Sequence, residues 1–208
     1  MRELTVYTDY KSPYAYLSKD LEYQLERDCV VRVHRLPYVL EIPSFLGSAR
    51  LGADGTVLEE NRNAHQWRRV RYSYMDCRRQ AGKRGLTIRG PRKIWDSALA
   101  GAGMLYAQRA GDAVFRRYHD AVFERFWKRE LDIEDIAVIA AVLDEAGADG
   151  GGFARDAVAV RDEVAAVSRA AEAKGVFGVP TYVLDDEIFW GREHLPDIRE
   201  MLAVQPAA

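Results

Sequence analysis

Ser12 stands at the junction of a predicted strand and a predicted helix, where its hydroxyl group has two possible functions. Residues 4–9 alternate with the two-residue period of a strand, and residues 14–25 repeat apolar side chains at helical steps of three or four. Ser12 therefore takes the N-cap position, and Pro13 occupies the first turn, where a missing N–H has no cost. The hydroxyl can cap its own helix, or it can face a bound anion beside the positive end of the helix dipole. These residues alone leave both functions open.

A strongly basic stretch runs from Asn61 to Lys93, in a chain whose net charge is −2. It contains one acidic residue, Asp76, and eleven basic residues: Arg62, Arg68, Arg69, Arg71, Arg78, Arg79, Lys83, Arg84, Arg89, Arg92 and Lys93. The stretch can be a solvated helix face that pairs with acidic helices elsewhere, or a site for a carboxylate-bearing ligand. Interleaved aromatic side chains also allow stacking on nucleobases, but no known nucleic-acid motif accompanies them, so we expect no nucleic-acid partner.

The cysteines and histidines indicate neither a redox centre nor a metal site. Cys29 and Cys77 are far apart and form no Cys-x-x-Cys pair, so we expect two free thiols that are buried or half-buried. The four histidines show no metal-ligand spacing, and we expect no metal.

Composition is that of an ordinary globular chain. The 208 residues are 48% hydrophobic and 30% charged, which fits one domain or one domain with a large insert. No apolar run approaches the roughly 18 residues that span a bilayer, and we expect no membrane contact. The chain passes from Met1 directly into a strand without an apolar signal segment, which predicts a cytoplasmic protein.

The elements that must position Ser12 are predicted in chain order. A strand at 4–10, a helix at 13–26 and a strand at 30–37 form a βαβ unit with a parallel pair. Residues 38–56 are expected to be irregular, because proline and glycine punctuate them. Two helices are expected next, at about 64–84 and 95–110. Asp112 is expected to cap the following helix, and Asp132, with Asp135 at the capping-box position, the one after it. A last helix of this block is expected from about 153 to Gly175.

The C-terminal part predicts two more strands and a closing helix. Two short apolar runs flank Asp185 and Asp186, and this pattern predicts a tight hairpin turn. A helix is expected at about 195–202. A βαβ half, an inserted block of helices and a ββα half together make an α/β fold with a mixed sheet.

Motifs at the two ends of the chain resemble a known family. Ser12-Pro13-Tyr14 at a helix start, the run from Gly175 to Thr181, and Phe189-Trp190-Gly191 resemble the thioredoxin-fold proteins of the DsbA-like branch. Within that branch the chain looks most like 2-hydroxychromene-2-carboxylate isomerases and kappa-class glutathione transferases. The resemblance implies a thioredoxin-like domain made of 1–37 and 175–208, with the preceding helix from about 153. Residues 38–152 would be a mainly helical insertion.

The resemblance also implies a cofactor, glutathione, and residues that hold it. Disulfide oxidoreductases of this fold carry Cys-x-x-Cys at the helix start, where this chain has Ser12-Pro13-Tyr14-Ala15. In the isomerase and transferase branch, the serine matching Ser12 holds and activates the glutathione thiol, beside Pro13 and Tyr14. Pro180 matches a cis-proline of the family, and the backbone of Val179 would pair with the glutathione peptide like an added strand.

Two positions depart from the family pattern. Arg192-Glu193 stands where relatives carry a polar residue and Asp for the γ-glutamyl end of glutathione, so Glu193 would take the ammonium and Arg192 a carboxylate. The insert lacks the family's Asn-Pro-Pro stretch, but Arg69-Val70-Arg71-Tyr72 resembles a Lys-Gly-x-Tyr step. That match would place Arg69 at the glycine carboxylate of glutathione.

The expected activity is therefore a glutathione-dependent isomerisation or transfer on a small conjugated, possibly aromatic electrophile, with Ser12 as the catalytic residue. A non-enzymatic module that binds a peptide or protein at the Val179–Pro180 edge is the main alternative. A thiol-disulfide oxidoreductase is a third, which the missing Cys-x-x-Cys disfavours. Dimers are common in the family, and a homodimer is possible here.

Overall fold

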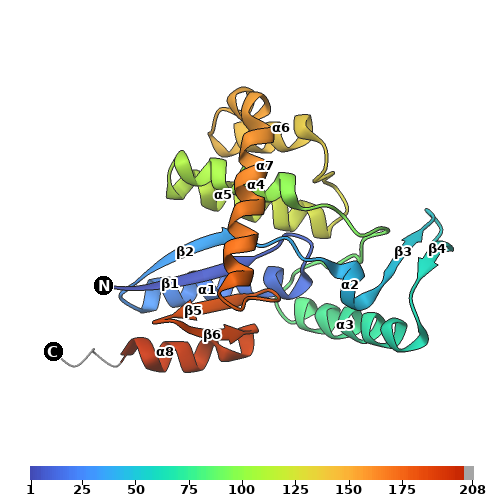
Figure 1. Cartoon of the computed structure of the whole chain (residues 1–208), viewed down its shortest axis with the longest axis horizontal. Coiled ribbons are helices and arrows are strands. Elements are labelled where there is room, and N and C mark those ends of the chain that lie inside the picture. The colour runs from blue at the N-terminus through green and yellow to red at the C-terminus, as the bar shows by residue number, and fades with distance from the viewer. Residues whose placement is uncertain (204–208) are drawn as a thin grey trace.

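The chain is built around a four-stranded mixed sheet (Figure 1). The structure, a computed structural model, describes residues 1–203. The strands of this sheet, in the order β2-β1-β5-β6, are β1 (Arg2–Thr8), β2 (Val31–Pro37), β5 (Thr181–Leu184) and β6 (Glu187–Trp190). β1 and β2 are parallel, whereas β5 is antiparallel to both β1 and β6. The predicted βαβ unit and C-terminal hairpin are confirmed, and Asp185 and Asp186 turn the hairpin with positive φ.

Helices cover both faces of the sheet (Figure 1). They are α1 (Pro13–Asp28), α2 (Ile42–Leu46), α3 (Ala64–Gly82), α4 (Ala98–Arg109), α5 (Asp112–Trp127), α6 (Ile136–Ala146), α7 (Gly150–Ala173), the 3-10 turn η1 (Arg192–His194) and α8 (Leu195–Ala203). Leu4 and Val6 of β1 pack with Leu195 and Ile198 of α8, while the next residue, Tyr7, joins the larger core. That larger core extends through α4 to α7. No helix within residues 1–203 is both long and apolar enough to cross a bilayer.

The inserted block has more structure than its sequence indicates. The expectation of an irregular 38–56 is wrong, because this segment contains α2 and the strand β3 (Ser48–Leu51), which pairs with β4 (Val57–Asn61). The β3–β4 hairpin projects from the molecule beside α3 (Figure 1). All five residues of β4 are exposed, so burial leaves no alternating pattern in the sequence that would have predicted it.

Four helix starts differ from the prediction, and α4 is the first, because it begins at Ala98 rather than at about 95. Gly111 rather than Asp112 is the N-cap of α5, and Asp135 rather than Asp132 is the N-cap of α6, where its side chain accepts the N–H groups of Ala137 and Val138. The last long helix begins at Gly150, three residues before the predicted start. The division of the chain into a thioredoxin-like domain and an insertion at 38–152 stays a prediction. The C-terminal segment of that domain, 175–208, includes residues 204–208, which lie outside the described residues.

A histidine is buried in the aromatic core between α1 and α5. His119 is 1% exposed, and its Nδ1 lies 2.9 Å from the Tyr10 hydroxyl. The rings of Tyr10, Phe115 and Phe123 surround it. Burial, reinforced by the charges of Arg35, Lys19 and Arg116, lowers the pKa of His119 well below its ordinary value. His119 is therefore neutral in the folded protein at neutral pH.

This burial predicts that stability falls on acidification. Unfolded His119 takes up a proton near its ordinary pKa of about 6.5, whereas the folded chain resists protonation, so stability is present above that pH and lost below it. We expect one such group to contribute up to about 1.4 kcal/mol per pH unit to the decline. Urea unfolding at a series of pH values should show a flatter decline for His119→Asn, whose side-chain amide takes the place of Nδ1 toward Tyr10 and does not titrate. An equal slope in wild type and variant would contradict this assignment.

Candidate functional site

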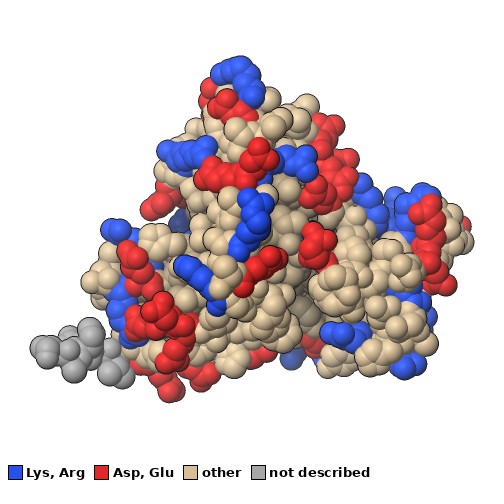
Figure 2. Space-filling model, in the orientation of Figure 1, with Lys and Arg blue, Asp and Glu red and all other residues tan. Residues whose placement is uncertain are grey.

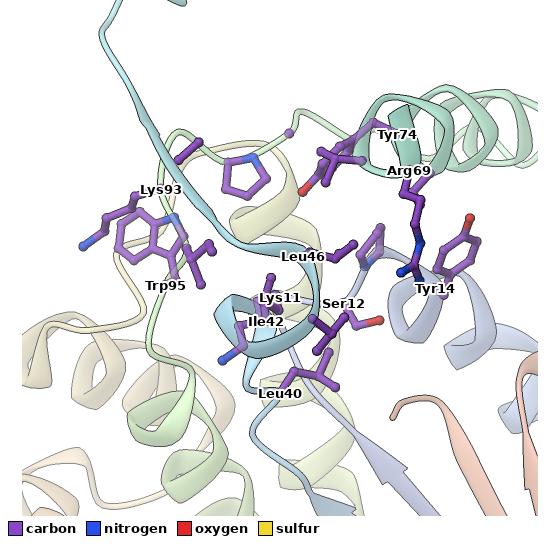
Figure 3. Close-up of a pocket in the computed structure, with 18 of the residues that line it drawn as sticks. Lys11, Ser12, Tyr14, Leu40, Ile42, Leu46, Arg69, Tyr74, Lys93 and Trp95 are labelled. Carbon is purple, nitrogen blue, oxygen red and sulfur yellow. The ribbon is translucent and has the colours of Figure 1, made fainter. Parts of the chain in front are cut away.

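A cavity of about 740 Å³ lies between the start of α1, α2, α3 and the loop before β5 (Figure 3). Five of the sequence-predicted residues line it: Ser12, Pro13, Tyr14, Arg69 and Val179. Much of the remaining wall is apolar and comes from Leu40, Ile42, Phe45, Leu46, Leu51, Val70, Ile94 and Trp95. The cavity therefore has a polar end at the start of α1 and an apolar body.

Ser12 occupies the N-cap of α1, as predicted. Its Oγ accepts the N–H of Ala15 at 3.2 Å, and the side chain is almost completely buried. A hydroxyl group has one hydrogen to donate besides its acceptor lone pairs. Capping therefore leaves the Ser12 hydrogen available to a ligand in the cavity, and the two functions left open by the sequence are compatible.

An aspartate holds the turn that presents Ser12. The carboxylate of Asp9 accepts the N–H of Lys11 at 3.0 Å and the N–H of Leu40 at 2.8 Å, which ties the end of β1 to the segment after β2. The Asp9 side chain is fully buried. Lys11 is 5% exposed, lines the cavity, and places its Nζ 3.6 Å from Asp9 Oδ2. A buried ammonium thus lies next to Ser12 in sequence and shares its cavity.

The loop before β5 forms the opposite side of the polar end. The Val179–Pro180 peptide bond is cis, Val179 lines the cavity, and Pro180 is buried beside it. The loop is fixed by the Thr181 hydroxyl, which donates to the carbonyl of Gly178 at 2.7 Å, and by the N–H of Gly191, which donates to the carbonyl of Pro180. Within residues 1–203 the backbone of Val179 makes no backbone hydrogen bond of its own.

Two exposed aromatic side chains stand at the rim of this end. Phe177 and Trp190 are 62% and 52% exposed, and their ring centroids are 4.9 Å apart. Gly178 allows this close approach, because a β-carbon there would lie 2.6 Å from Trp190 Nε1. Sequence reasoning missed this pair as part of the site, since nothing in the sequence distinguishes a rim tryptophan from a core one.

Tyr14 and Arg69 lie together at the polar end, from α1 and α3 (Figure 3). The Tyr14 hydroxyl is turned toward α3, 3.4 Å from Asp76 Oδ2, and burial and the neighbouring Cys77 raise its pKa. Tyr14 therefore offers the cavity mainly its ring. Arg69 forms no ion pair within the part of the chain that the structure describes.

Arg192 and Glu193 lie outside the cavity lining. Arg192 hydrogen-bonds Gln80 of α3, its guanidinium lies 5.9 Å from the Tyr14 ring centre, and its Nη1 is buried without a partner in the described residues. Glu193 is exposed in η1. The roles predicted for these two residues at the γ-glutamyl end of glutathione stay predictions, and the structure does not bring them to Ser12.

Every charged side chain that lines the cavity is basic. Eight basic residues line it and no acidic residue does; the eight are Lys11, Arg62, Arg69, Arg71, Arg78, Arg92, Lys93 and Arg129. By contrast, acidic and basic side chains are interspersed over the outer face drawn in Figure 2. Among the eleven basic residues of 61–93, the described ion pairs join Arg79 to Asp76 and Lys93 to Glu134. The stretch is therefore largely not a helix face paired with acidic helices.

Two of these basic residues could not have been assigned from the sequence. Lys11 lies beside Ser12, but a lysine at a helix start gives no sign that it is buried. Arg129 lies far along the chain, at the end of α5, and only the packing of α5 against the segment after α3 brings it to the cavity. Cys29 is half-buried and Cys77 is buried, both free, as predicted.

Comparison with known proteins agrees with the fold described above. The model of the DSBA-like thioredoxin domain family matches residues 3–203. A 2-hydroxychromene-2-carboxylate isomerase from Sphingobium xenophagum is 25% identical over 210 residues, covering 97% of this chain and 98% of that protein. A solved 2-hydroxychromene-2-carboxylate isomerase superposes with a TM-score of 0.74 at 22% identity, covering 97% of this chain and 94% of the other. A probable DsbA oxidoreductase from Streptomyces coelicolor gives 0.74 at 19% identity, with coverage of 100% and 93%.

Proposed function

Because the chain belongs to the DSBA-like thioredoxin domain family, we propose that it is a glutathione-dependent isomerase, or a transferase, acting on a small conjugated electrophile. One observation carries the proposal: Ser12 at the start of α1 and the backbone of Val179, which has no hydrogen-bond partner among residues 1–203, face one cavity whose remaining wall is mostly apolar. The curated relative named as an isomerase, with 25% identity over almost the whole chain, supports the same class.

The residues at the polar end fit the proposed cofactor. A tripeptide with an extended backbone can pair with a stretch of backbone that has free N–H and C=O groups, which Val179 offers in the loop before β5 within the described residues. Its carboxylates need cations, and Arg69 lies at this end without an ion-pair partner in the described residues. Its thiol needs a donor, which is the Ser12 hydroxyl hydrogen that capping leaves available.

The chemistry requires a thiolate, and two features of this chain favour one. When bound, glutathione would supply a thiolate that adds to the conjugated carbonyl substrate and is expelled after bond rotation, or stays attached in a transfer. Ser12 would hold that sulfur by donating its hydroxyl hydrogen. The N-terminus of α1 adds its positive dipole end, and both effects lower a thiol pKa.

Lys11 is a second cation with a proposed role. Thiolate addition to a conjugated carbonyl puts negative charge on the carbonyl oxygen, and a fixed positive charge in a water-poor cavity stabilises such an oxygen. Asp9 holds Lys11 in place, and Lys11 lines the cavity beside Ser12. Lys11 would therefore face the substrate oxygen while Ser12 holds the sulfur.

The test is an assay with 2-hydroxychromene-2-carboxylate and, separately, with a chlorodinitrobenzene electrophile, each with and without glutathione. An isomerase should need glutathione and leave its concentration unchanged, whereas a transferase should consume one glutathione for each product formed. Ser12→Ala and the fold-neutral control Arg68→Gln, on an exposed position of α3 outside the cavity, separate catalysis at this site from background reaction. Failure of glutathione to bind at millimolar concentration would remove the proposal.

The exposed pair at the cavity rim supports the alternative, a module that binds a peptide along Val179. Phe177 and Trp190 would then hold side chains of the peptide. Such a module should bind an extended peptide without turnover and be insensitive to Ser12→Ala. Thiol-disulfide exchange has less support, because burial raises the pKa of the Cys77 thiol to about 11 and the Ser12–Ala15 window carries no sulfur. An insulin-reduction assay tests it.

A further inference from the structure

Three guanidinium groups gather around one loop on the cavity wall. Arg129 Nε donates to the carbonyl of Gly90 at 2.9 Å, and Arg78 Nε donates to the carbonyl of Ile88 at 3.4 Å. Arg92 follows in the same loop and also lines the cavity. The three come from different parts of the chain: α3, the loop after it, and the turn that follows α5.

The local geometry brings these cations close to one another. Burial lowers the pKa of Arg129, and repulsion from Arg92, Arg89 and Arg78 acts in the same direction. Burial raises the pKa of the neighbouring Tyr74 phenol to about 12, against the effect of Arg78 and Arg129 among other arginines. Repulsion between fixed like charges opposes this arrangement, so a bound anion would stabilise it.

Arg129 also adopts a backbone conformation that L-residues avoid. Its φ is +62°, in the left-handed region that favours glycine. In this conformation its side chain turns back to the carbonyl of Gly90. The backbone thus accommodates Arg129 at this point of the cavity.

In the described part of the chain, no carboxylate pairs with these three cations. None of the cavity-lining residues is acidic, and within residues 1–203 no carboxylate forms an ion pair with Arg78, Arg92 or Arg129. Their described hydrogen bonds go to backbone carbonyls, including Arg92 Nη2 to Ala53 at 3.4 Å. Each guanidinium has five N–H donors in a planar fork, so donors remain for a ligand.

We propose that Arg78, Arg92 and Arg129 form a binding site for a dianionic oxyanion, a phosphate monoester or two neighbouring carboxylates. A single carboxylate would neutralise one of the three cations. A dianion would neutralise two, and its several oxygens can accept paired N–H donors from each arginine. Ile94 and Trp95 line the same cavity next to this loop and would contact the apolar part of the ligand. The ligand is then an aromatic or apolar compound with a doubly charged head group.

If the dianion is the electrophile, the catalytic role of this site rests on the proposed function. Binding of a dianion to the three arginines can be tested without that function. The test is therefore calorimetric titration without glutathione, using phthalate and phenyl phosphate as dianions and benzoate as the matched monoanion. Arg78→Gln and Arg129→Gly remove one cation each, and Arg129→Gly also suits the left-handed backbone. Arg68→Gln removes an exposed cation of α3 outside the cavity as the control.

We expect at least one dianion to bind about tenfold more tightly than benzoate, and Arg78→Gln and Arg129→Gly to lose about tenfold each while Arg68→Gln loses nothing. Phthalate or phenyl phosphate as the tighter ligand identifies a dicarboxylate or a phosphate as the source of the dianion. Benzoate binding as tightly as both dianions, an equal loss in Arg68→Gln, or no binding of any probe would overturn the site. Dianion binding with no glutathione binding would keep the site and remove the thiol function.

Discussion

Replacing Ser12 with alanine is expected to raise the pKa of the bound glutathione thiol by about 1 to 2 units and to slow turnover by about 10- to 100-fold. The reason is that Ser12 would donate a hydrogen bond to a charged sulfur, and hydrogen bonds to charged groups contribute about 1.5 to 3 kcal/mol. The measurement is a pH titration of thiolate absorbance with glutathione bound, alongside steady-state turnover of the electrophile.

The variant also loses a helix cap, which needs its own control. Ser12 Oγ accepts the N–H of Ala15, and loss of such a cap costs about 1 kcal/mol of stability. Ser12→Thr retains both the cap and the donor and should restore the low thiol pKa. Ser12→Asp retains the cap but offers no donor and adds a negative charge, so it should fold and fail to stabilise the thiolate. Turnover of Ser12→Ala equal to that of wild type would remove Ser12 from catalysis.

Replacing Asp9 with alanine is expected to reduce the free energy of unfolding by about 3 to 5 kcal/mol. Asp9 is fully buried, and its carboxylate accepts two backbone N–H groups and neutralises Lys11, itself 5% exposed. The variant leaves a buried ammonium without a counter-charge and two N–H groups without acceptors. Urea unfolding of wild type and variant measures the loss.

A double-mutant cycle separates the charge from the hydrogen bonds. Lys11→Met should cost less than Asp9→Ala, because Asp9 keeps its bonds to the N–H groups of Lys11 and Leu40. Asp9→Ala combined with Lys11→Met should be more stable than the sum of the single losses predicts, by about 1 to 3 kcal/mol, since no unpaired ammonium remains. Strict additivity would mean that the 3.6 Å pair contributes no coupling, and a loss under about 1 kcal/mol for Asp9→Ala would contradict the structural role.

Much of the fold follows from local sequence patterns. The alternation before Ser12, the helical period after it and the Asp185–Asp186 turn are short-range features, and the structure has the elements that they predict. Ser12 as an N-cap was equally local, because a cap depends on a side chain and the N–H groups two or three residues ahead. The hairpin of β3 and β4 escaped prediction because its exposed strand carries no burial period.

The sequence also located most of the polar end of the site, through motifs at the two ends of the chain. Ser12, Tyr14, Arg69 and Val179 do line one cavity, whereas Arg192 lies outside its lining, between Gln80 and the ring of Tyr14. A motif fixes the order of residues along the chain, whereas the direction of a long arginine side chain depends on the neighbours that packing supplies.

Tertiary structure alone decided the charge of the cavity and the burial of Lys11. The sequence shows a basic stretch at 61–93, but whether those side chains meet carboxylates or a cavity depends on contacts between distant elements. Arg129 joins Arg78 only because α5 ends beside the loop at Gly90, and Lys11 becomes a buried ammonium only because Asp9 ties β1 to Leu40. Local sequence determines helices, strands and caps through short-range sterics and hydrogen bonds, whereas burial and electrostatic neighbours are properties of the packed chain.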